Sequence, residues 1–178
     1  METRKGGKFV RILCDGLLYG MMGLYFLILF LLLFGKRPVG TFQSVNLIPF
    51  HEIGAYLFGG DIARRAFGLG NILGNIVIFI PLGLYVSFLH RKGKLLSNTA
   101  IVAAVSTAAE AAQYLFRVGA ADIDDVILNT LGGFLGALLF YALNRWFKGG
   151  AKTAITFLAP AGGLLIFAML ILGGNLRF

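Results

Sequence analysis

Long apolar runs alternate with short polar segments along this chain, and that pattern predicts a helical membrane protein. A transmembrane helix needs about 20 predominantly apolar residues. Several runs reach that length, so we expect five transmembrane helices, at residues 16–35, 70–90, 96–116, 125–146 and 153–173. Because unpaired backbone groups are costly in lipid, these runs should be helical. The expected fold class is an all-α, polytopic membrane helix bundle, organised as a single domain over residues 1–178.

Residues 36–69 form a segment that is too polar to span a membrane and too long for a tight connection. Phe42, Phe50, Tyr56 and Phe58 are aromatic residues of the kind that favour the membrane–water interface. We expect this segment to form a cap on the outer face that partly enters the headgroup region. A disordered loop is the alternative, although the segment is not low in hydrophobicity.

Lysine and arginine outnumber aspartate and glutamate by 16 to 8, which gives the chain a net charge of +8. The basic residues cluster between the apolar runs instead of sharing one soluble face, so the charge does not indicate a nucleic-acid partner. Cytoplasmic loops carry an excess of such residues. The clusters at residues 4–11, 91–94 and 145–152 therefore predict N-terminus in and C-terminus out. Cys14 is the single cysteine, which excludes an internal disulfide and a cysteine-based metal site.

The third predicted helix carries a polar face, because Ser106, Glu110, Gln113 and Arg117 follow helical spacing. A charged side chain at the centre of a membrane helix costs about 2.5–3.5 kcal/mol by insertion scales. Glu110 should therefore face inward. It is either ionised and paired with Arg117 or another basic residue, or protonated because burial favours the neutral form. A hydrogen bond that only joins two helices is the simpler alternative.

The fourth predicted helix opens with DIDDVILN, in which three carboxylates precede an asparagine. Helical spacing places Asp122, Asp125 and Asn129 on one side of the helix and Asp124 on another. An aspartate at a helix N-terminus caps free N–H groups, and we assign that role to Asp122. Three carboxylates exceed what capping needs, so Asp125 is the stronger functional candidate.

Two further features concern how the helices pack. Asn71 and Asn75 lie one turn apart on the second predicted helix, in which Pro81 should introduce a kink. Asparagines at such positions often only join helices. On the fourth helix, Gly132 and Gly136 form a pair of small residues that should let another helix approach closely.

Polar groups from several helices should lie at one depth, because the second and fourth predicted helices start on the side where the third ends. The cap lies on that same side, and the opposite leaflet should carry almost no polar groups. We infer one polar pocket that opens to the outer face, with Glu110 and Asp125 as candidate catalytic residues. The expected ligand-binding residues are Asn46, Arg64, Arg65, Asn71, Asn75, Glu110, Gln113, Arg117, Asp122, Asp125 and Asn129.

The segments NLIPF at 46–50, GNIVIFIPLG at 74–83, EAAQ at 110–113 and DIDDVILNTLGG at 122–133 resemble motifs of the VanZ-like family, and they occur in family order. This is a bacterial membrane family named for a teicoplanin-resistance protein. The resemblance implies a compact helical domain in the bacterial cytoplasmic membrane, linked to the cell envelope and to reduced susceptibility to the glycopeptide teicoplanin. The last predicted helix, at 153–173, carries no such motif and is expected to be peripheral to the core at 46–136. The matched positions are Asn46, Pro49, Phe50, Asn75, Phe79, Pro81, Gly83, Glu110, Gln113, Asp122, Asp125, Asn129 and Gly132.

Three functions are compatible with these residues. The first is a protein that binds or remodels an envelope lipid or a lipid-linked cell-wall precursor, with arginines on phosphate and carboxamides on hydroxyl or amide groups. The second is an intramembrane acid–base or metal-assisted enzyme that acts on a lipid headgroup, although no serine elbow, HExxH motif or cysteine nucleophile is present. The third is a lipid transporter or flippase, against which the chain shows no inverted repeat.

The expected partners follow from these functions. They are a membrane lipid or a lipid-linked cell-wall precursor and, through the resemblance, a glycopeptide antibiotic. A homodimer is compatible with the sequence. We expect no cofactor, with Mg²⁺ or Ca²⁺ at Asp122, Asp124 and Asp125 as the alternative, and an enzyme is the less favoured interpretation.

Overall fold

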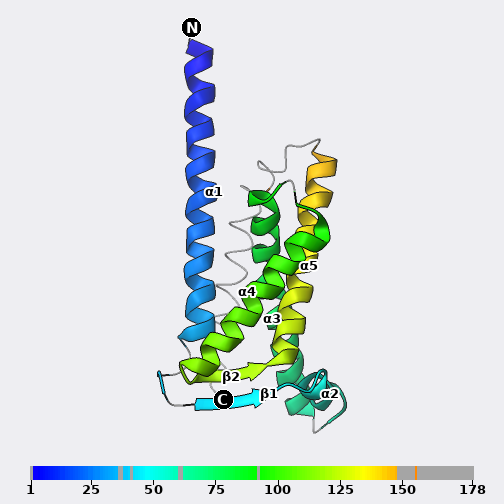
Figure 1. Ribbon diagram of the computed structural model, residues 1–178. Helices are drawn as coiled ribbons and strands as arrows, with labels where there is room; N and C mark the ends of the chain where they lie inside the picture. Colours follow the sequence, from blue (N-terminus) through cyan, green and yellow to red (C-terminus); the bar gives the residue numbers. More distant parts are fainter. Residues whose placement is uncertain are drawn as a thin grey trace. The chain divides into compact units, whose positions relative to one another are not determined.

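The structure is a computed structural model and describes residues 2–35, 38–40, 42–59, 62–91, 93–147 and 155. Figure 1 labels its elements, which are α1 (Glu2–Phe34), β1 (Phe42–Asn46), α2 (His51–Phe58), α3 (Ile62–Leu89), α4 (Leu95–Leu115), β2 (Val118–Asp122) and α5 (Ile123–Trp146). The chain divides into two compact units, Met1–Ile28 together with Tyr141–Phe178, and Leu29–Phe140. The second unit holds all the residues that the sequence analysis expects to bind a ligand.

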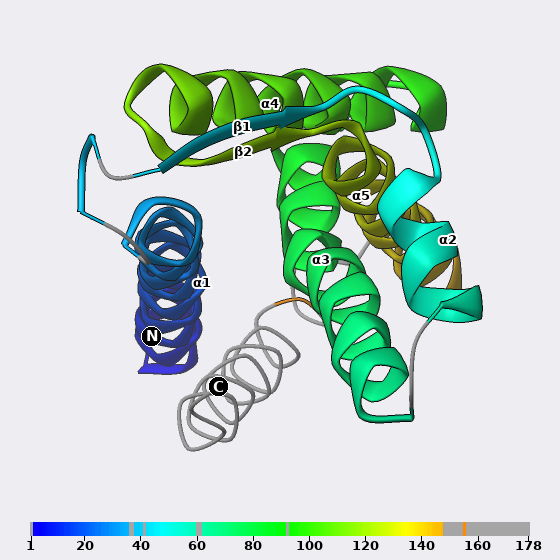
Figure 2. The same cartoon turned by 90° about the horizontal axis from the view of Figure 1, so that it is seen from below.

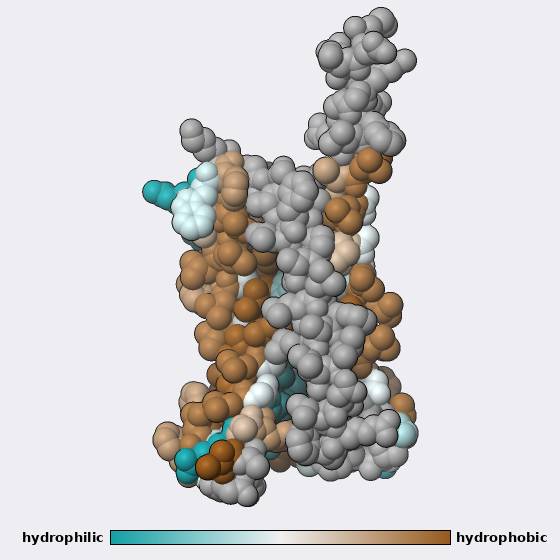
Figure 3. Space-filling view, turned by 180° about the vertical axis from the view of Figure 1, so that it is seen from behind, coloured by the Kyte–Doolittle hydropathy of each residue, from teal (hydrophilic) through white to brown (hydrophobic). Residues whose placement is uncertain are grey.

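Four helices are long and apolar enough to cross a membrane, over Ile12–Phe34, Arg65–Leu89, Leu95–Leu115 and Ile123–Trp146. They correspond to the first four predicted spans, so the predicted all-α membrane bundle is confirmed. The fifth predicted span, at residues 153–173, lies outside the described residues. In the space-filling view of Figure 3, hydrophobic residues cover the long sides of the described helices, and hydrophilic residues gather near the helix ends.

The predicted cap at residues 36–69 needs one correction, because helix α3 already begins at Ile62. The predicted second span starts at residue 70, a few positions after the last charged residue before it, Arg65. Hydropathy marks only the part of a helix that lipid covers, whereas backbone hydrogen bonding continues through alanine and arginine, which are good helix formers. The segment therefore contains β1, α2 and the first turns of α3.

Two short strands were not predicted, and they lie at one end of the second unit. Strand β1 pairs with β2 in parallel, from Phe42 opposite Val118 to Asn46 opposite Asp122. The pair runs alongside α4, as Figure 2 shows, and α2 packs against α3. We term the end that holds β1, β2 and α2 the cap end. No local pattern specifies a pairing between segments 76 residues apart.

Helices α3 and α5 approach each other through glycines. A Cβ atom on Gly132 would overlap the backbone carbonyl of Ile76, and one on Gly136 would overlap the carbonyl of Ile80. The structure therefore shows the close approach predicted for this pair of small residues. It brings the polar side chains of α3 and α5 within hydrogen-bonding reach.

Candidate functional site

The parallel strand pair ends with Asn46 directly opposite Asp122. Asn46 Nδ2 donates a hydrogen bond to Asp122 Oδ1 at 3.1 Å, and Asn46 Oδ1 accepts one from the backbone N of Ile48 at 3.3 Å. The carboxamide therefore joins the end of β1 to the start of α5 and also holds the turn that leads into α2.

Asp122 connects β2, α4 and α5, and it is only 5% exposed. Its Oδ1 accepts a hydrogen bond at 2.8 Å from the backbone N of Asp124, the second residue of α5, which is the N-cap geometry predicted for it. The backbone N of Asp122 donates to Glu110 Oε2 at 3.1 Å. Buried Glu110 thus has a backbone donor as its partner, and the alternative pairing with Arg117 does not occur in the described part of the chain.

Asp124 has a role that the sequence analysis missed, because it caps a helix other than its own. The N-cap residue of α2 is Phe50, whose own side chain cannot cap the helix and whose backbone is left-handed, with φ of 63°. The Asp124 carboxylate accepts hydrogen bonds from the backbone N atoms of Phe50, of Glu52 at 2.9 Å and of Ile53 at 3.1 Å. It therefore satisfies the N–H groups that a helix N-terminus leaves without partners. The only signal in the sequence was a third carboxylate beyond the needs of α5.

Hydrogen bonds donated by two asparagine side chains join the long helices. Asn75 Nδ2 of α3 donates to Asp125 Oδ1 of α5. One turn further along α5, Asn129 Nδ2 donates to Ser106 Oγ of α4 at 3.0 Å, and both of these residues are buried. The polar faces predicted from helical spacing therefore meet between α3, α4 and α5.

Glu52 adds a carboxyl group from the first turn of α2. The Tyr56 hydroxyl donates to its Oε2 at 3.3 Å. Burial and then the negative charge of Asp122 raise the pKa of Glu52 above its ordinary value. Burial and then the charge of Glu52 likewise raise the pKa of the Tyr56 hydroxyl. Like charges are therefore held close together at this end of the unit.

Five of the chain's eight acidic residues meet at the cap end, and we term them the carboxylate cluster: Glu52, Glu110, Asp122, Asp124 and Asp125. The N–H groups that donate to Glu110, Asp122 and Asp124 belong to the backbone and to Asn46, and all of them are neutral. Within the described residues, no group of three histidine, cysteine, aspartate or glutamate side chains is arranged to hold a metal ion. The cluster concentrates negative charge and hydrogen-bond acceptors in a chain of net charge +8.

Two of the three predicted arginines, Arg65 and Arg117, lie some distance from this cluster along their own elements. Arg117 is exposed before the first residue of β2, so the extended strand places it about 16 Å from Asp122. Arg65 is exposed on α3, about 15 Å along the helix from Asn75. The side chain of Arg64 lies outside the described part.

Two predicted carboxamides are also separate from the cluster. Gln113 Nε2 donates to the backbone carbonyl of Leu33 at 2.7 Å, which satisfies an acceptor in the last turn of α1. Asn71 is half-buried on α3, one turn before Asn75. Gln113 therefore connects helices, whereas Asn75 of α3 bonds to Asp125 of the carboxylate cluster.

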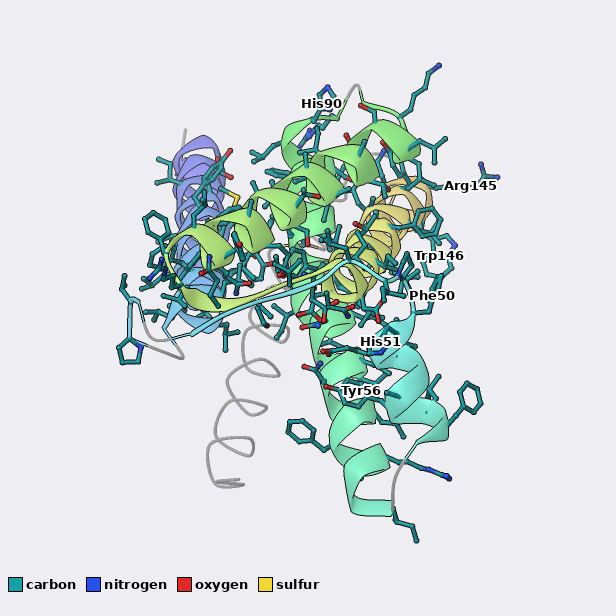
Figure 4. All side chains as sticks on the ribbon, turned by 60° about the horizontal axis from the view of Figure 1, so that its bottom comes forward. Phe50, His51, Tyr56, His90, Arg145 and Trp146 are labelled. Carbon is teal, nitrogen blue, oxygen red and sulfur yellow. The ribbon has the colours of Figure 1, made fainter. Side chains whose placement is uncertain are left out.

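The opposite end of the unit also contains buried polar groups, which corrects the expectation that it has almost none. Asn98 Nδ2 donates to Ser87 Oγ at 3.1 Å, and Asn98 Oδ1 lies 2.9 Å from His90 Nδ1. Ser87 and Asn98 are fully buried. Figure 4 shows His90 near the start of α4, away from His51 and Tyr56 on α2. We term Ser87, His90 and Asn98 the hairpin network because they join α3 to α4.

Comparison with known proteins gives a consistent result. A family model described as VanZ/LLP1 matches residues 22–145. Protein VanZ of Enterococcus faecium is 32% identical over 170 residues, which cover 94% of this chain and 96% of that protein. No solved structure matches the chain. The range matched by the family model contains both strands and the whole carboxylate cluster.

Proposed function

The chain belongs to the VanZ/LLP1 family, and from that premise we propose that its cap end binds the polar headgroup of an envelope lipid or a lipid-linked cell-wall component. This binding lowers the susceptibility of the cell to teicoplanin. The protein acts in the bacterial cytoplasmic membrane with N-terminus in and C-terminus out. The basic segments that flank the helices support this orientation, which places the cap end outside.

One observation carries the proposal: polar side chains from α2, α3, α4, α5 and both strands converge at the cap end, where most of the buried carboxyl groups lie. Five polar residues from five different elements take part in two hydrogen-bonded sets: Asn46, Asp122 and Glu110 form one, and Asn75 and Asp125 form the other. Polar groups inside a membrane protein are costly, and they commonly mark sites of function. The cap end lies at the depth where the headgroup of a membrane lipid would contact the protein.

A second candidate, an intramembrane acid–base enzyme, is favoured by the position of Glu110. This carboxyl group is 6% exposed and is bonded to the strand end that leads directly into Asp125. Two carboxyl groups in different surroundings are a common arrangement for a proton donor and acceptor. Turnover of a lipid headgroup by the purified protein, lost in Glu110→Gln, would support this candidate over simple binding.

The proposed function is tested by expressing the chain in a teicoplanin-susceptible Gram-positive host. We expect the intact protein to raise the inhibitory concentration of teicoplanin and Glu110→Gln to return it to the vector level. Ser87→Ala removes a buried hydroxyl from the hairpin network and serves as the matched control, with resistance retained. Equal resistance in the Glu110→Gln variant, at equal membrane abundance, would contradict a role for the cap end.

A further inference from the structure

Asn129 carries the one buried side-chain oxygen or nitrogen without a hydrogen-bond partner in the described part of the chain. Its carboxamide is 2% exposed, and Nδ2 donates to Ser106 Oγ, whereas Oδ1 receives no donor. A buried acceptor left without a donor costs about 1–3 kcal/mol. Native proteins contain few such groups, so the Asn129 oxygen points to a donor from outside the polypeptide.

This oxygen lies close to the carboxylate cluster along both α4 and α5. Asn129 lies one helical turn after Asp125 on α5, and Ser106 lies one turn before Glu110 on α4. The bond between Asn129 and Ser106 therefore joins α4 to α5 one helical turn from Glu110 and Asp125. Glu110 uses Oε2 for the backbone N of Asp122, so Oε1 remains as a second acceptor.

The donors of the neighbouring carboxamides are already engaged. Nδ2 of Asn46 is bonded to Asp122, and Nδ2 of Asn75 is bonded to Asp125. Neither Glu110 nor Asp122 pairs with a lysine or arginine within the described ranges. The site therefore offers acceptors and negative charge, and a phosphate group would be repelled by it.

We infer that this site takes a primary ammonium group, which donates hydrogen bonds to Asn129 Oδ1 and Glu110 Oε1. A primary ammonium carries three N–H donors and a positive charge, which matches what the site lacks. The inference rests on the proposed function and specifies its ligand chemistry. An aminophospholipid headgroup and the side-chain amine of a lipid-linked cell-wall peptide both supply such a group.

The ligand chemistry is tested by native mass spectrometry of the full chain after exchange into lipid nanodiscs. The probes are phosphatidylethanolamine, its N-monomethyl and N,N-dimethyl forms, phosphatidylcholine and phosphatidylglycerol. We expect phosphatidylethanolamine to be retained about tenfold over phosphatidylcholine and phosphatidylglycerol, with a stepwise decline along the methyl series as N–H donors are lost. Equal retention of phosphatidylethanolamine and phosphatidylcholine would overturn the ammonium inference.

Two variants show whether the named acceptors are responsible. Asn129→Leu removes Oδ1 at similar volume, and Glu110→Gln removes the charge but keeps an acceptor for the backbone N of Asp122. Both should lose most of the preference for phosphatidylethanolamine, while Ser87→Ala keeps it. If Asn129→Leu melts like the wild type and keeps the preference, the unpartnered oxygen has no ligand role, and the inference is wrong.

A second pair of probes separates the two sources of the amine. A lipid-linked cell-wall precursor with a free side-chain amine is compared with the same precursor after acetylation of that amine. Retention that acetylation abolishes assigns the site to the precursor, and retention of phosphatidylethanolamine alone assigns it to the aminophospholipid. Headgroup retention that ignores both acetylation and methylation but is lost in Glu110→Gln overturns the ammonium inference and leaves the proposed function standing. Without retention of any probe above bulk lipid, both fail.

Discussion

The two ends of the Leu29–Phe140 unit solve the same problem, burial of polar groups among apolar helices, in different ways. The hairpin network is local, since its bonds join residues 8 and 11 positions apart, and its side chains carry no formal negative charge. At the cap end, several bonds join residues 50 to 76 positions apart, and carboxylates accept most of these. The hairpin network closes a turn between two helices. The cap end holds the tertiary structure together and still contains an acceptor without a donor.

This difference separates structural polarity from functional polarity. In the hairpin network Asn98 uses its Nδ2 for Ser87 and its Oδ1 for His90, so these buried polar atoms have partners within the protein. In the carboxylate cluster Asp122 and Asp124 have structural roles as caps, and these roles explain two of the three carboxylates that open α5. What capping does not explain is the pair of Glu110 Oε1 and Asn129 Oδ1 below them. Three substitutions test this division between structural and functional polar groups.

Asp124→Ala should cause the largest loss of stability, because it removes the cap that α2 receives from α5. We expect the free energy of unfolding to fall by about 3 kcal/mol, since several backbone N–H groups lose a charged acceptor. Unfolding by denaturant in detergent measures the loss. Asp124→Asn keeps one acceptor oxygen and should lose about half as much. A wild-type unfolding curve for Asp124→Ala would mean that α2 does not depend on this carboxylate.

Asn98→Leu should destabilise the hairpin network without affecting the cap end. We expect a loss of about 1.5 kcal/mol, because Ser87 Oγ and His90 Nδ1 lose a buried partner. The same unfolding assay, combined with lipid retention and teicoplanin susceptibility, distinguishes the two ends. Loss of lipid retention in this variant at unchanged abundance would show that the two ends are coupled.

Glu52 should make the stability of the cap end depend on pH with a defined sign. Burial, followed by the charge of Asp122, raises its pKa above the ordinary value of 4.5. A group with a raised folded-state pKa contributes stability below the unfolded pKa, and this contribution is lost as the pH rises through the folded value. The melting temperature of the wild type, measured relative to that of Glu52→Gln, should therefore fall as the pH rises from 4 to 8. If the melting temperatures of the two proteins change equally with pH across that range, the charge of Glu52 does not affect the stability of the cap end.

Helical spacing was sufficient to predict much of the site. It placed Glu110 with Ser106 on one face of α4, and Asp125 with Asn129 on one face of α5, and the structure brings these faces together. Period and hydropathy are properties of neighbouring residues, so they also identified the four described spans. The glycine pair on α5 predicted close packing for the same reason.

The amino-acid order was enough to specify a membrane helix bundle with most of its acidic residues near one end, because hydrophobic periodicity and charge are properties of short segments. Which carboxylate caps which helix depends instead on long-range contacts. The β1–β2 pair sets Asn46 against Asp122, and Asp124 reaches across 74 positions to cap α2. A hydrogen bond between distant segments depends on how the chain closes in space, and no repeat or spacing in the sequence records that closure.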